Sequence, residues 1–389
     1  MIGVTAVALL VMIGHAAMAL AVVNRMHGTG FPRPVLKIFD GLWYLFTCGV
    51  PLLLGSWFLQ ITVHDWRLPR SPFDHLAIGY ITICGLAMLW GLAHVAIRGL
   101  RPVTTRRLIA NHTSRVNIGE RLGEPPIAGN LARWMHAIPG NQILDLHIHE
   151  KKIELPRLDQ RLDGLTITHL SDLHFTGQLQ QSFYEQIVEQ ANQLDADLVA
   201  ITGDIIDKPR CYSWITETLA KLKSRLGVFF VLGNHEQRLK DEARVRATLT
   251  EAGMFDAGSM WHRLWHNGAP ICLAGNERPW FGVAPDMNAC PDTDAPTPLR
   301  ILLAHTPDLF KWSCQHDFDL MLAGHTHGGQ IRFPIIGPIV SPSLQGTRYA
   351  SGTFFHPPTL LHVSRGIAGT RPLRINCPPE LTKLCLKSG

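Results

Sequence analysis

Long apolar runs near the N-terminus and much shorter ones further along divide the chain into two parts. Residues 2–23, 41–63 and 76–97 each contain no Asp, Glu, Lys or Arg. A membrane-spanning helix needs about 20 predominantly apolar residues, so these runs predict three transmembrane helices in an anchor formed by residues 1–98. The first run has no basic segment before it and is longer than the apolar core of a signal peptide. We therefore expect it to be a membrane span.

From residue 141 onward, apolar runs of four to six residues alternate with amphipathic segments. Short runs are typical of buried strands, and a 3.6-residue period indicates helices. We predict strands at residues 143–148, 165–170, 198–202, 228–232, 271–274, 301–304, 320–323, 360–363 and 373–375, and helices at 182–194, 212–222 and 239–252. This alternation predicts a layered α/β body over residues 141–389.

Residues 99–140 lie between these parts and form a basic connector. Its Leu131, Trp134, Met135 and Ile138 recur at helical spacing, with Arg133 among them. A short helix lying at the membrane surface has this pattern. A segment that packs on the α/β body would have it as well, and the two interpretations stay open.

The net charge of +5 is unevenly distributed. Residues 1–100 sum to +3, residues 101–140 to +4, and residues 141–389 to −2. A body that binds nucleic acid would need a basic face, so we expect no nucleic-acid partner. The basic pI belongs to the anchor and the connector.

The arginines and lysines near the spans predict an orientation, because such residues stay on the cytoplasmic side. One side of the membrane would hold Arg25, Arg33 and Lys37 in the first loop, and the basic connector after the third span. The other side would hold only Arg67 and Arg70. This predicts a multi-pass protein of the bacterial inner membrane with its catalytic body in the cytoplasm.

Five of the predicted strands end in polar motifs. In chain order these are T-H-L-S-D-L-H at 168–174, A-I-T-G-D-I-I-D at 200–207, F-V-L-G-N-H-E at 230–236, L-A-H-T-P-D at 303–308 and L-A-G-H-T-H-G-G-Q at 322–330. Ligand sites of α/β sheets form at the carboxyl ends of the strands. The motifs are weak singly, but their joint occurrence indicates one site.

The motifs supply seven oxygen or imidazole donors and no cysteine. They are Asp172, His174, Asp204, Asn234, His305, His325 and His327. Seven donors are too many for one tetrahedral zinc ion and suit two divalent ions that share a bridging carboxylate. Such a pair of ions stabilises the attacking and leaving oxygens of an in-line phosphoryl displacement. Asp-x-His and His-x-His would each put both side chains on one face of an extended segment.

These motifs resemble those of the calcineurin-like metallophosphoesterases, whose blocks run D-x-H, G-D-x-x-D, G-N-H-E, H and G-H-x-H. The resemblance covers residues 141–389, and no ligand position is substituted. It implies a sandwich of two mixed sheets flanked by helices. The stretches S-D-L-H-F, G-H-T-H-G-G-Q and R-P-L-R-I-N-C-P-P-E are similar to a membrane-associated bacterial subgroup, which includes cell-envelope phosphodiesterases and a UDP-2,3-diacylglucosamine pyrophosphatase.

The resemblance also implies roles for individual residues. Asp172, His174 and His327 would hold one metal, Asn234, His305 and His325 the other, and Asp204 would bridge them. His235 would protonate the leaving oxygen or stabilise its charge, with a metal-activated water as the nucleophile. Asp207, Glu236 and Asp308 would orient ligand imidazoles, although caps or surface charges would explain them equally well. Mn²⁺ is the first expectation for both ions, with Fe or Zn²⁺ as alternatives.

The expected partners are the lipid bilayer and a phosphorylated substrate. The subgroup and the predicted topology favour UDP-2,3-diacylglucosamine, which would be hydrolysed to a lipid monophosphate and UMP. Another phospholipid, a nucleotide, a cell-wall phosphodiester or a small molecule stays open. Two other classes of function are a non-catalytic membrane sensor and a transporter with a phosphoesterase appendage. The filled ligand positions argue against the sensor, and the absence of acidic residues from the three predicted spans argues against the transporter.

Overall fold

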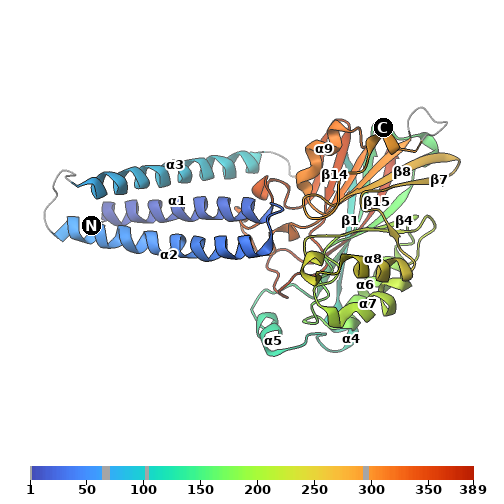
Figure 1. Cartoon of the computed structure of the whole chain (residues 1–389), viewed down its shortest axis with the longest axis horizontal. Helices are drawn as coiled ribbons and strands as arrows, with labels where there is room; N and C mark the ends of the chain where they lie inside the picture. Colours follow the sequence, from blue (N-terminus) through green and yellow to red (C-terminus); the bar gives the residue numbers. More distant parts are fainter. Residues whose placement is uncertain (1, 64–70, 101–104, 292–297) are drawn as a thin grey trace. The chain divides into compact units, whose positions relative to one another are not determined.

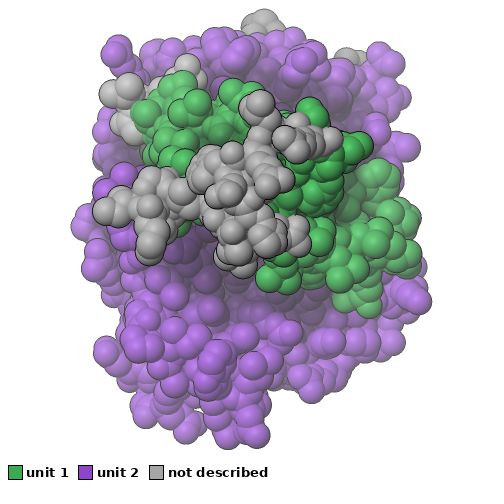
Figure 2. All heavy atoms as spheres, turned by 90° about the vertical axis from the view of Figure 1, so that its left-hand side faces the viewer, with its two compact units in different colours: residues 1–102 green, residues 103–389 purple. Residues whose placement is uncertain are grey.

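The protein forms two compact units, residues 1–102 and residues 103–389 (Figure 2). The structure is a computed structural model that describes residues 2–63, 71–100, 105–291 and 298–389. Arg67, Arg70 and Arg101, which contribute to the predicted orientation, lie outside the described residues.

Unit 1 consists of long apolar helices (Figure 1). They are α1 (Ile2–His27), α2 (Arg33–Val63) and α3 (Pro72–Leu100). Among the described residues, these three helices are long and apolar enough to cross a membrane. Each predicted span lies within one of them.

Small and polar side chains pack the helices of unit 1 together. A Cβ built on Gly14 of α1 would lie 1.9 Å from the carbonyl oxygen of Cys84 of α3, so only glycine permits this approach. The ring of His15 bridges the other two helices through Tyr80 Oη at 2.6 Å and the Thr47 carbonyl at 3.0 Å. Apolar side chains such as Leu45 cover the outer faces and are exposed, as expected of surfaces that face lipid.

The larger of the sheets in unit 2 has seven strands within the described ranges. Its spatial order is β1 (Leu108–Asn117), β2 (Asp145–Leu155), β15 (Glu380–Ser388), β3 (Thr166–Leu170), β4 (Leu198–Thr202), β5 (Val228–Val231) and β6 (Phe255–Asp256). Strands β3 to β6 are parallel, whereas β1 is antiparallel to β2 and β15 is antiparallel to β3. The sheet is therefore mixed.

The second sheet has six strands in the part of the chain that the structure describes. Its order is β13 (Gly352–His356), β14 (Thr359–Val363), β10 (Leu320–Ala323), β9 (Leu299–Ala304), β8 (Ala269–Asn276) and β7 (Trp261–His266). The four central strands are parallel and both edge strands are antiparallel. A small hairpin, β11 (Arg332–Phe333) and β12 (Gly337–Pro338), lies outside both sheets.

The two sheets pack face to face around a core that contains Ile167 and Phe229 from the first sheet and Ile301 and Leu320 from the second. The outer face of the first sheet is covered by α6 (Gln181–Gln193), α7 (Tyr212–Glu217) and α8 (Glu242–Glu251). Helix α9 (Phe310–Gln315) packs on the second sheet (Figure 1). These layers confirm the α/β sandwich of two mixed sheets flanked by helices.

The structure differs from the prediction in several segments, and strands β7, β13 and β15 were not predicted at all. Residues 373–375 form no strand, and Ile375 makes only isolated bridges to Asn141 and Ile331. The helix predicted at 212–222 ends at Glu217, and a separate 3-10 turn, Leu219–Lys221, follows it. The connector contributes β1 to the first sheet, so unit 2 begins before residue 141.

The connector also contains two short helices, α4 (Ile118–Leu122) and α5 (Asn130–His136). Strand β1 has mostly exposed side chains at consecutive positions, so neither of its faces is buried along most of its length. It therefore lacks the apolar run by which the central strands were predicted.

Candidate metal centre

All five polar motifs meet where the carboxyl ends of the central strands of both sheets come together. Asp172 and His174 follow β3, Asp204 follows β4, and Asn234 follows β5. From the second sheet, His305 follows β9, while His325 and His327 follow β10. The structure thus brings together every ligand position predicted from the sequence.

Two glycines permit this convergence. A Cβ on Gly324 would lie 1.8 Å from Ser171 Oγ and 2.5 Å from Asp172 Oδ2. A Cβ on Gly233 would lie 2.3 Å from Asp204 Oδ1. Any larger residue would displace a candidate ligand, which explains the glycine that precedes the polar residue in these motifs.

Five candidate ligands have left-handed backbone conformations. Their φ values are 54° at Asp172, 50° at His174, 53° at Asp204, 69° at His325 and 50° at His327. Non-glycine residues rarely adopt this region, at a cost of about 1–3 kcal/mol each. Such strain concentrated in one place is typical of a functional site.

The first cluster of ligand atoms consists of Asp172, His174, Asp204 and His327, whose ligand atoms lie within 4.8 Å of one another. His174 Nε2 lies 3.2 Å from His327 Nε2 and 3.5 Å from Asp204 Oδ2. His327 Nε2 also lies 3.5 Å from Asp172 Oδ1.

The second cluster shares Asp204 and adds His305 and His325. His305 Nε2 lies 3.3 Å from Asp204 Oδ1, 3.2 Å from His325 Nδ1 and 3.2 Å from Asn234 Oδ1. The two carboxylate oxygens of Asp204 thus face different sets of imidazoles. This is the geometry that a bridging carboxylate requires.

The donor set fits divalent cations. The outer nitrogens of three imidazoles donate to fixed acceptors: His174 Nδ1 to Asp207 at 2.8 Å, His305 Nδ1 to the Thr202 carbonyl at 2.7 Å, and His327 Nδ1 to the Ala368 carbonyl at 3.3 Å. In neutral rings of His174 and His327, the two Nε2 atoms therefore present lone pairs to each other at 3.2 Å. A cation between them converts this repulsion into coordination, and such outer hydrogen bonds are typical of metal-bound histidine.

Asp207 joins a candidate ligand to the candidate general acid. One of its oxygens accepts the hydrogen bond from His174 Nδ1, and the other accepts from Nδ1 of His235. His235 Nε2 lies 3.8 Å from Asp204 Oδ2, and its ring packs edge-on against that of His174, so it borders the first cluster. Burial lowers the pKa of His235, and the charge of Asp204 opposes this effect.

The other two predicted orienting carboxylates do not contact imidazoles. Glu236 accepts backbone N–H groups of Asp204, Ile205, Ile206 and Gly233, and so it fixes the loops that carry the ligands. The carboxylate of Asp308 binds Ser343 Oγ and the backbone N–H groups of Leu344 and Gln345. The prediction that Glu236 and Asp308 orient ligand imidazoles was therefore wrong.

The buried carboxylates and imidazoles of the site shift one another's pKa. Burial raises the pKa of Asp172, whereas the nearby imidazoles of His235 and His305 outweigh the effect of burial on Asp204 and hold its pKa well below the usual value. The carboxylate of Asp204 likewise raises the pKa of His305 to about 9 against the effect of burial. Buried carboxylates need paired cations, and divalent ions would supply them.

Trp280 belongs to the site and was missed by the sequence analysis. Its ring centroid lies 4.7 Å from that of His325 and 5.3 Å from that of His305. It packs against the second cluster and shields it from solvent. No periodicity marks this residue, because it lies in a loop after β8.

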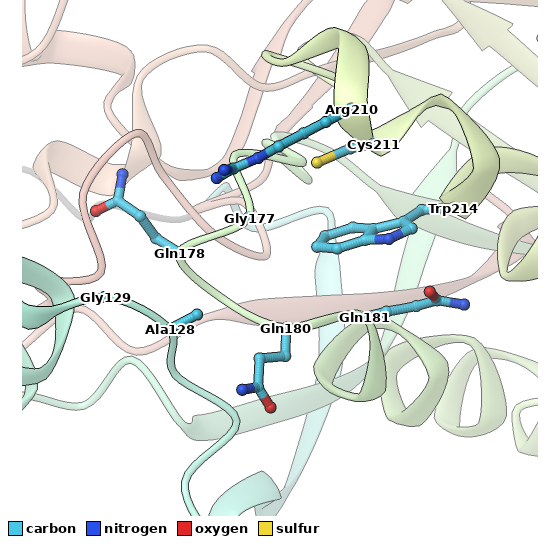
Figure 3. Close-up of a pocket in the computed structure, with 9 residues that line it drawn as sticks. All are labelled: Ala128, Gly129, Gly177, Gln178, Gln180, Gln181, Arg210, Cys211 and Trp214. Carbon is cyan, nitrogen blue, oxygen red and sulfur yellow. The ribbon is translucent and has the colours of Figure 1, made fainter.

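A cavity of about 480 Å³ lies among the loops that follow the ligands of the first sheet. Its wall includes Gly177 and Gln178, a few residues after His174, and Arg210 and Trp214, a few residues after Asp207. Figure 3 shows the Arg210 side chain extending toward Gly177; its Nη2 donates to the Thr176 carbonyl at 3.0 Å. The lining combines glutamine amides and the Arg210 guanidinium with the ring of Trp214.

Comparisons with known proteins agree with the site. The profile of the calcineurin-like phosphoesterase family matches residues 165–329. The "Uncharacterized metallophosphoesterase YkuE" of Bacillus subtilis is 31% identical over 244 residues, which cover 61% of this chain and 85% of the relative. Phosphodiesterase YaeI of Escherichia coli is 29% identical over 222 residues, or 56% of this chain and 80% of the relative.

A third relative, the "Transmembrane protein with metallophosphoesterase domain" of Bos taurus, is 31% identical over 256 residues, which cover 61% of this chain and 56% of the relative. The name of this relative mentions both a transmembrane protein and a metallophosphoesterase domain. The family implies divalent metal ions, and the clusters of His and Asp side chains fit them. The chain therefore belongs to the calcineurin-like phosphoesterase family and is a metal-dependent phosphoesterase.

Proposed function

We propose that the protein is a membrane-anchored phosphodiesterase that works with two divalent ions bridged by Asp204. The observation that supports this proposal most strongly is that the two oxygens of the Asp204 carboxylate face different histidines. Oδ2 faces His174, and Oδ1 faces His305. Asp172 and His327 would complete one ion's ligands, and Asn234 and His325 the other's. Mn²⁺ is the first choice and Fe or Zn²⁺ the alternatives, because mixed carboxylate, amide and imidazole donors suit all three.

When bound, the ions would activate a water molecule as the nucleophile and neutralise charge on the phosphoryl group. The protein side chains would perform the remaining work. His235 would donate a proton from Nε2 to the leaving oxygen, because Asp207 holds its Nδ1 proton and thereby orients the ring. Trp280 would keep bulk water away from His305 and His325.

We propose UDP-2,3-diacylglucosamine as the substrate, hydrolysed to a lipid monophosphate and UMP. The support is the presence of candidate membrane spans and a phosphoesterase site in one chain, which suits an amphiphile whose phosphate lies near the headgroup plane. The cavity with Arg210 and Trp214 would take a nucleotide headgroup, since a guanidinium and an aromatic ring suit phosphate and base. Another phospholipid, a nucleotide or a cell-wall phosphodiester is the alternative.

The substrate assay uses the purified full chain with Mn²⁺. We expect release of UMP from UDP-2,3-diacylglucosamine, measured by chromatography. Cleavage of bis(p-nitrophenyl) phosphate without any release of UMP would leave the phosphodiesterase activity standing and eliminate this substrate.

For localisation, we propose three spans in the bacterial inner membrane, with the catalytic body in the cytoplasm. The support is the excess of basic residues in the first loop and after the third span. A reporter fused after Gly389 tests the orientation. Activity of a reporter that works only in the periplasm would contradict it.

A further inference from the structure

The segment that follows the ligand loop of the second sheet is basic and partly apolar. From residue 320 to residue 379 the sequence contains five arginines and no Asp or Glu. The hairpin of β11 and β12 lies within it and exposes Phe333, Ile335 and Ile336, and Val340 shortly after it is exposed as well. Ile335 is 99% exposed, so its side chain contacts almost nothing in the protein. Clustered apolar side chains in water mark an interaction surface.

Helix α5 presents a second exposed apolar group. Leu131 and Trp134 point into solvent, and Trp134 is 64% exposed. Arg133 lies between them and is exposed as well. For Leu131 and Trp134 the sequence allowed two interpretations, a helix at the membrane surface or a segment packed on the α/β body. Their exposure shows that Leu131 and Trp134 are not packed into the core of unit 2.

Hydrogen bonds connect α5 to the hairpin. Asn141 Nδ2 donates to the carbonyl of Met135 in α5 at 2.9 Å and to the carbonyl of Pro372 at 2.8 Å. Three residues further on, the carbonyl of Ile375 accepts the backbone N–H of Arg332 in β11 at 2.9 Å. The two exposed apolar groups therefore belong to one connected region of unit 2.

Within α5 and residues 320–379 the exposed Lys, Arg, Asp and Glu side chains are all arginines. Arg133, Arg348 and Arg371 are exposed. Arg365 is turned inward to Glu380, with Nε 2.9 Å from its carboxylate, and Arg374 is fully buried. The remaining arginine, Arg332, is partly buried and binds the Gly328 carbonyl.

The carboxylate of Asp308 contacts the segment that follows the hairpin. Asp308 is mostly buried and already accepts hydrogen bonds from Ser343 and from the backbone of Leu344 and Gln345. The negative charge of Asp308 is therefore already compensated by these hydrogen bonds and offsets little of the positive charge of the exposed arginines. We call this region, formed by α5, the β11–β12 hairpin, Arg348 and Arg371, the apolar-basic face.

We propose that the apolar-basic face contacts an anionic bilayer, with Ile335 and Trp134 reaching the boundary between headgroups and acyl chains. Aliphatic and aromatic tips beside arginines are the combination that interfacial membrane binding requires, because anionic headgroups attract the arginines and the apolar tips leave water. The same chain contains candidate membrane spans, which would attach it to a bilayer. The inference deepens the proposed function and rests on the membrane attachment assumed there.

This contact would bring lipid to the metal ligands. Only Gly328 to Ile331 separate His327 from β11, so the hairpin and the ligand loop form one continuous segment. Lipid bound at the hairpin would have its headgroup near the strand ends that carry the ligands. An amphiphilic substrate would then reach the site without leaving the bilayer.

Photo-crosslinking in the full chain tests the contact. The variant Ile335→benzoylphenylalanine is reconstituted in nanodiscs that contain either phosphatidylglycerol or phosphatidylcholine, and adducts are identified by mass spectrometry. The matched control is Trp265→benzoylphenylalanine, at a half-exposed position of β7. Figure 1 shows β7 on the opposite side of unit 2 from α5. Both positions are at the surface, so neither variant should disturb the fold.

We expect lipid adducts at position 335 in several-fold excess over position 265, and more with phosphatidylglycerol than with phosphatidylcholine. Adding Arg348→Glu should lower the yield with phosphatidylglycerol. Equal yields at both positions, or adducts at position 335 only to a second copy of the chain, would overturn the proposal. Crosslinking does not depend on catalysis, so lipid adducts without release of UMP would refute the proposed substrate and leave the membrane contact in place.

Discussion

Gly324 and Ser171 approach so closely that a Cβ on the glycine would lie 1.8 Å from the serine hydroxyl. Ser171 directly follows β3 of the first sheet and Gly324 directly follows β10 of the second, and Ser171 Oγ in turn donates to Asp172 Oδ2 at 2.7 Å. The contact thus sets the distance between ligands that come from the first sheet and those that come from the second.

Replacement of this glycine should disturb the centre. We expect Gly324→Ala to force Asp172 and His325 apart, with a loss of about 1–3 kcal/mol in stability from overpacking and a large loss of bound metal. Metal content by inductively coupled plasma mass spectrometry and the melting temperature measure the two effects. Gly85→Ala is the control, because a Cβ on Gly85 would meet nothing within 4 Å. Normal metal content in Gly324→Ala would show that the close approach is unnecessary.

Removal of His235 should separate proton donation from metal binding. We expect His235→Ala to keep near-normal metal content and to lose about 10²–10⁴-fold in kcat for a phosphodiester whose leaving group needs a proton. The loss should be much smaller for bis(p-nitrophenyl) phosphate, because p-nitrophenolate leaves without protonation. Equal losses for both substrates would argue against a general acid.

Asp207→Asn is the companion variant. Asp207 holds both His235 and His174, so this change should weaken metal affinity by about 10–100-fold in addition to lowering kcat. Metal titration of activity distinguishes it from His235→Ala. An unchanged metal affinity would show that the hydrogen bond to His174 is not needed to orient that ligand.

Histidines buried away from the metal centre should make the fold sensitive to acid. Burial lowers the pKa of His149 to about 3 and that of His362 to about 4, from an ordinary value of 6.5. As the pH falls below 6.5, the unfolded chain takes up protons that the folded chain excludes, so stability falls by about 1.4 kcal/mol per pH unit for each such group. The loss continues down to the pKa of the folded state.

The melting temperature at pH 7.5 and pH 5.5, followed by near-ultraviolet circular dichroism, tests this expectation. His362→Gln carries no titrating group and should show a smaller decrease between the two values than the wild type. His362 Nδ1 lies 2.9 Å from His169 Nδ1, across the two sheets, so the variant will also be less stable at pH 7.5. An identical decrease in both proteins would show that His362 is not the source.

Chelation should lower stability as well as activity. Ions that bind only the folded chain stabilise it by about 2.7 kcal/mol at a concentration of 100 times Kd. We expect ethylenediaminetetraacetate to lower the melting temperature of the wild type, and added Mn²⁺ to restore it. A melting temperature unaffected by chelation would mean that the ions contribute nothing to the fold.

The sequence predicted the candidate metal ligands more completely than it predicted the strands and loop contacts around them. The ligands lie directly after buried parallel strands such as β4, whose run of apolar residues predicted its bounds correctly. Strand β15 was missed although it lies between β2 and β3, because Lys383 and Lys387 interrupt its apolar pattern. Trp280 and the roles of Glu236 and Asp308 depend on contacts between distant loops. The local pattern of apolar and polar residues along the sequence contains no information about such contacts.

The stoichiometry of bound metal in the wild type and in Asp204→Asn tests the central claim most directly. The change removes a charge and one carboxylate oxygen from the residue whose two oxygens face the two clusters, and it keeps the size of the side chain. We predict two divalent ions per chain in the wild type, and loss of both ions and of nearly all phosphodiesterase activity in Asp204→Asn. Full activity in Asp204→Asn, or a single ion in the active wild type, would contradict the two-metal account.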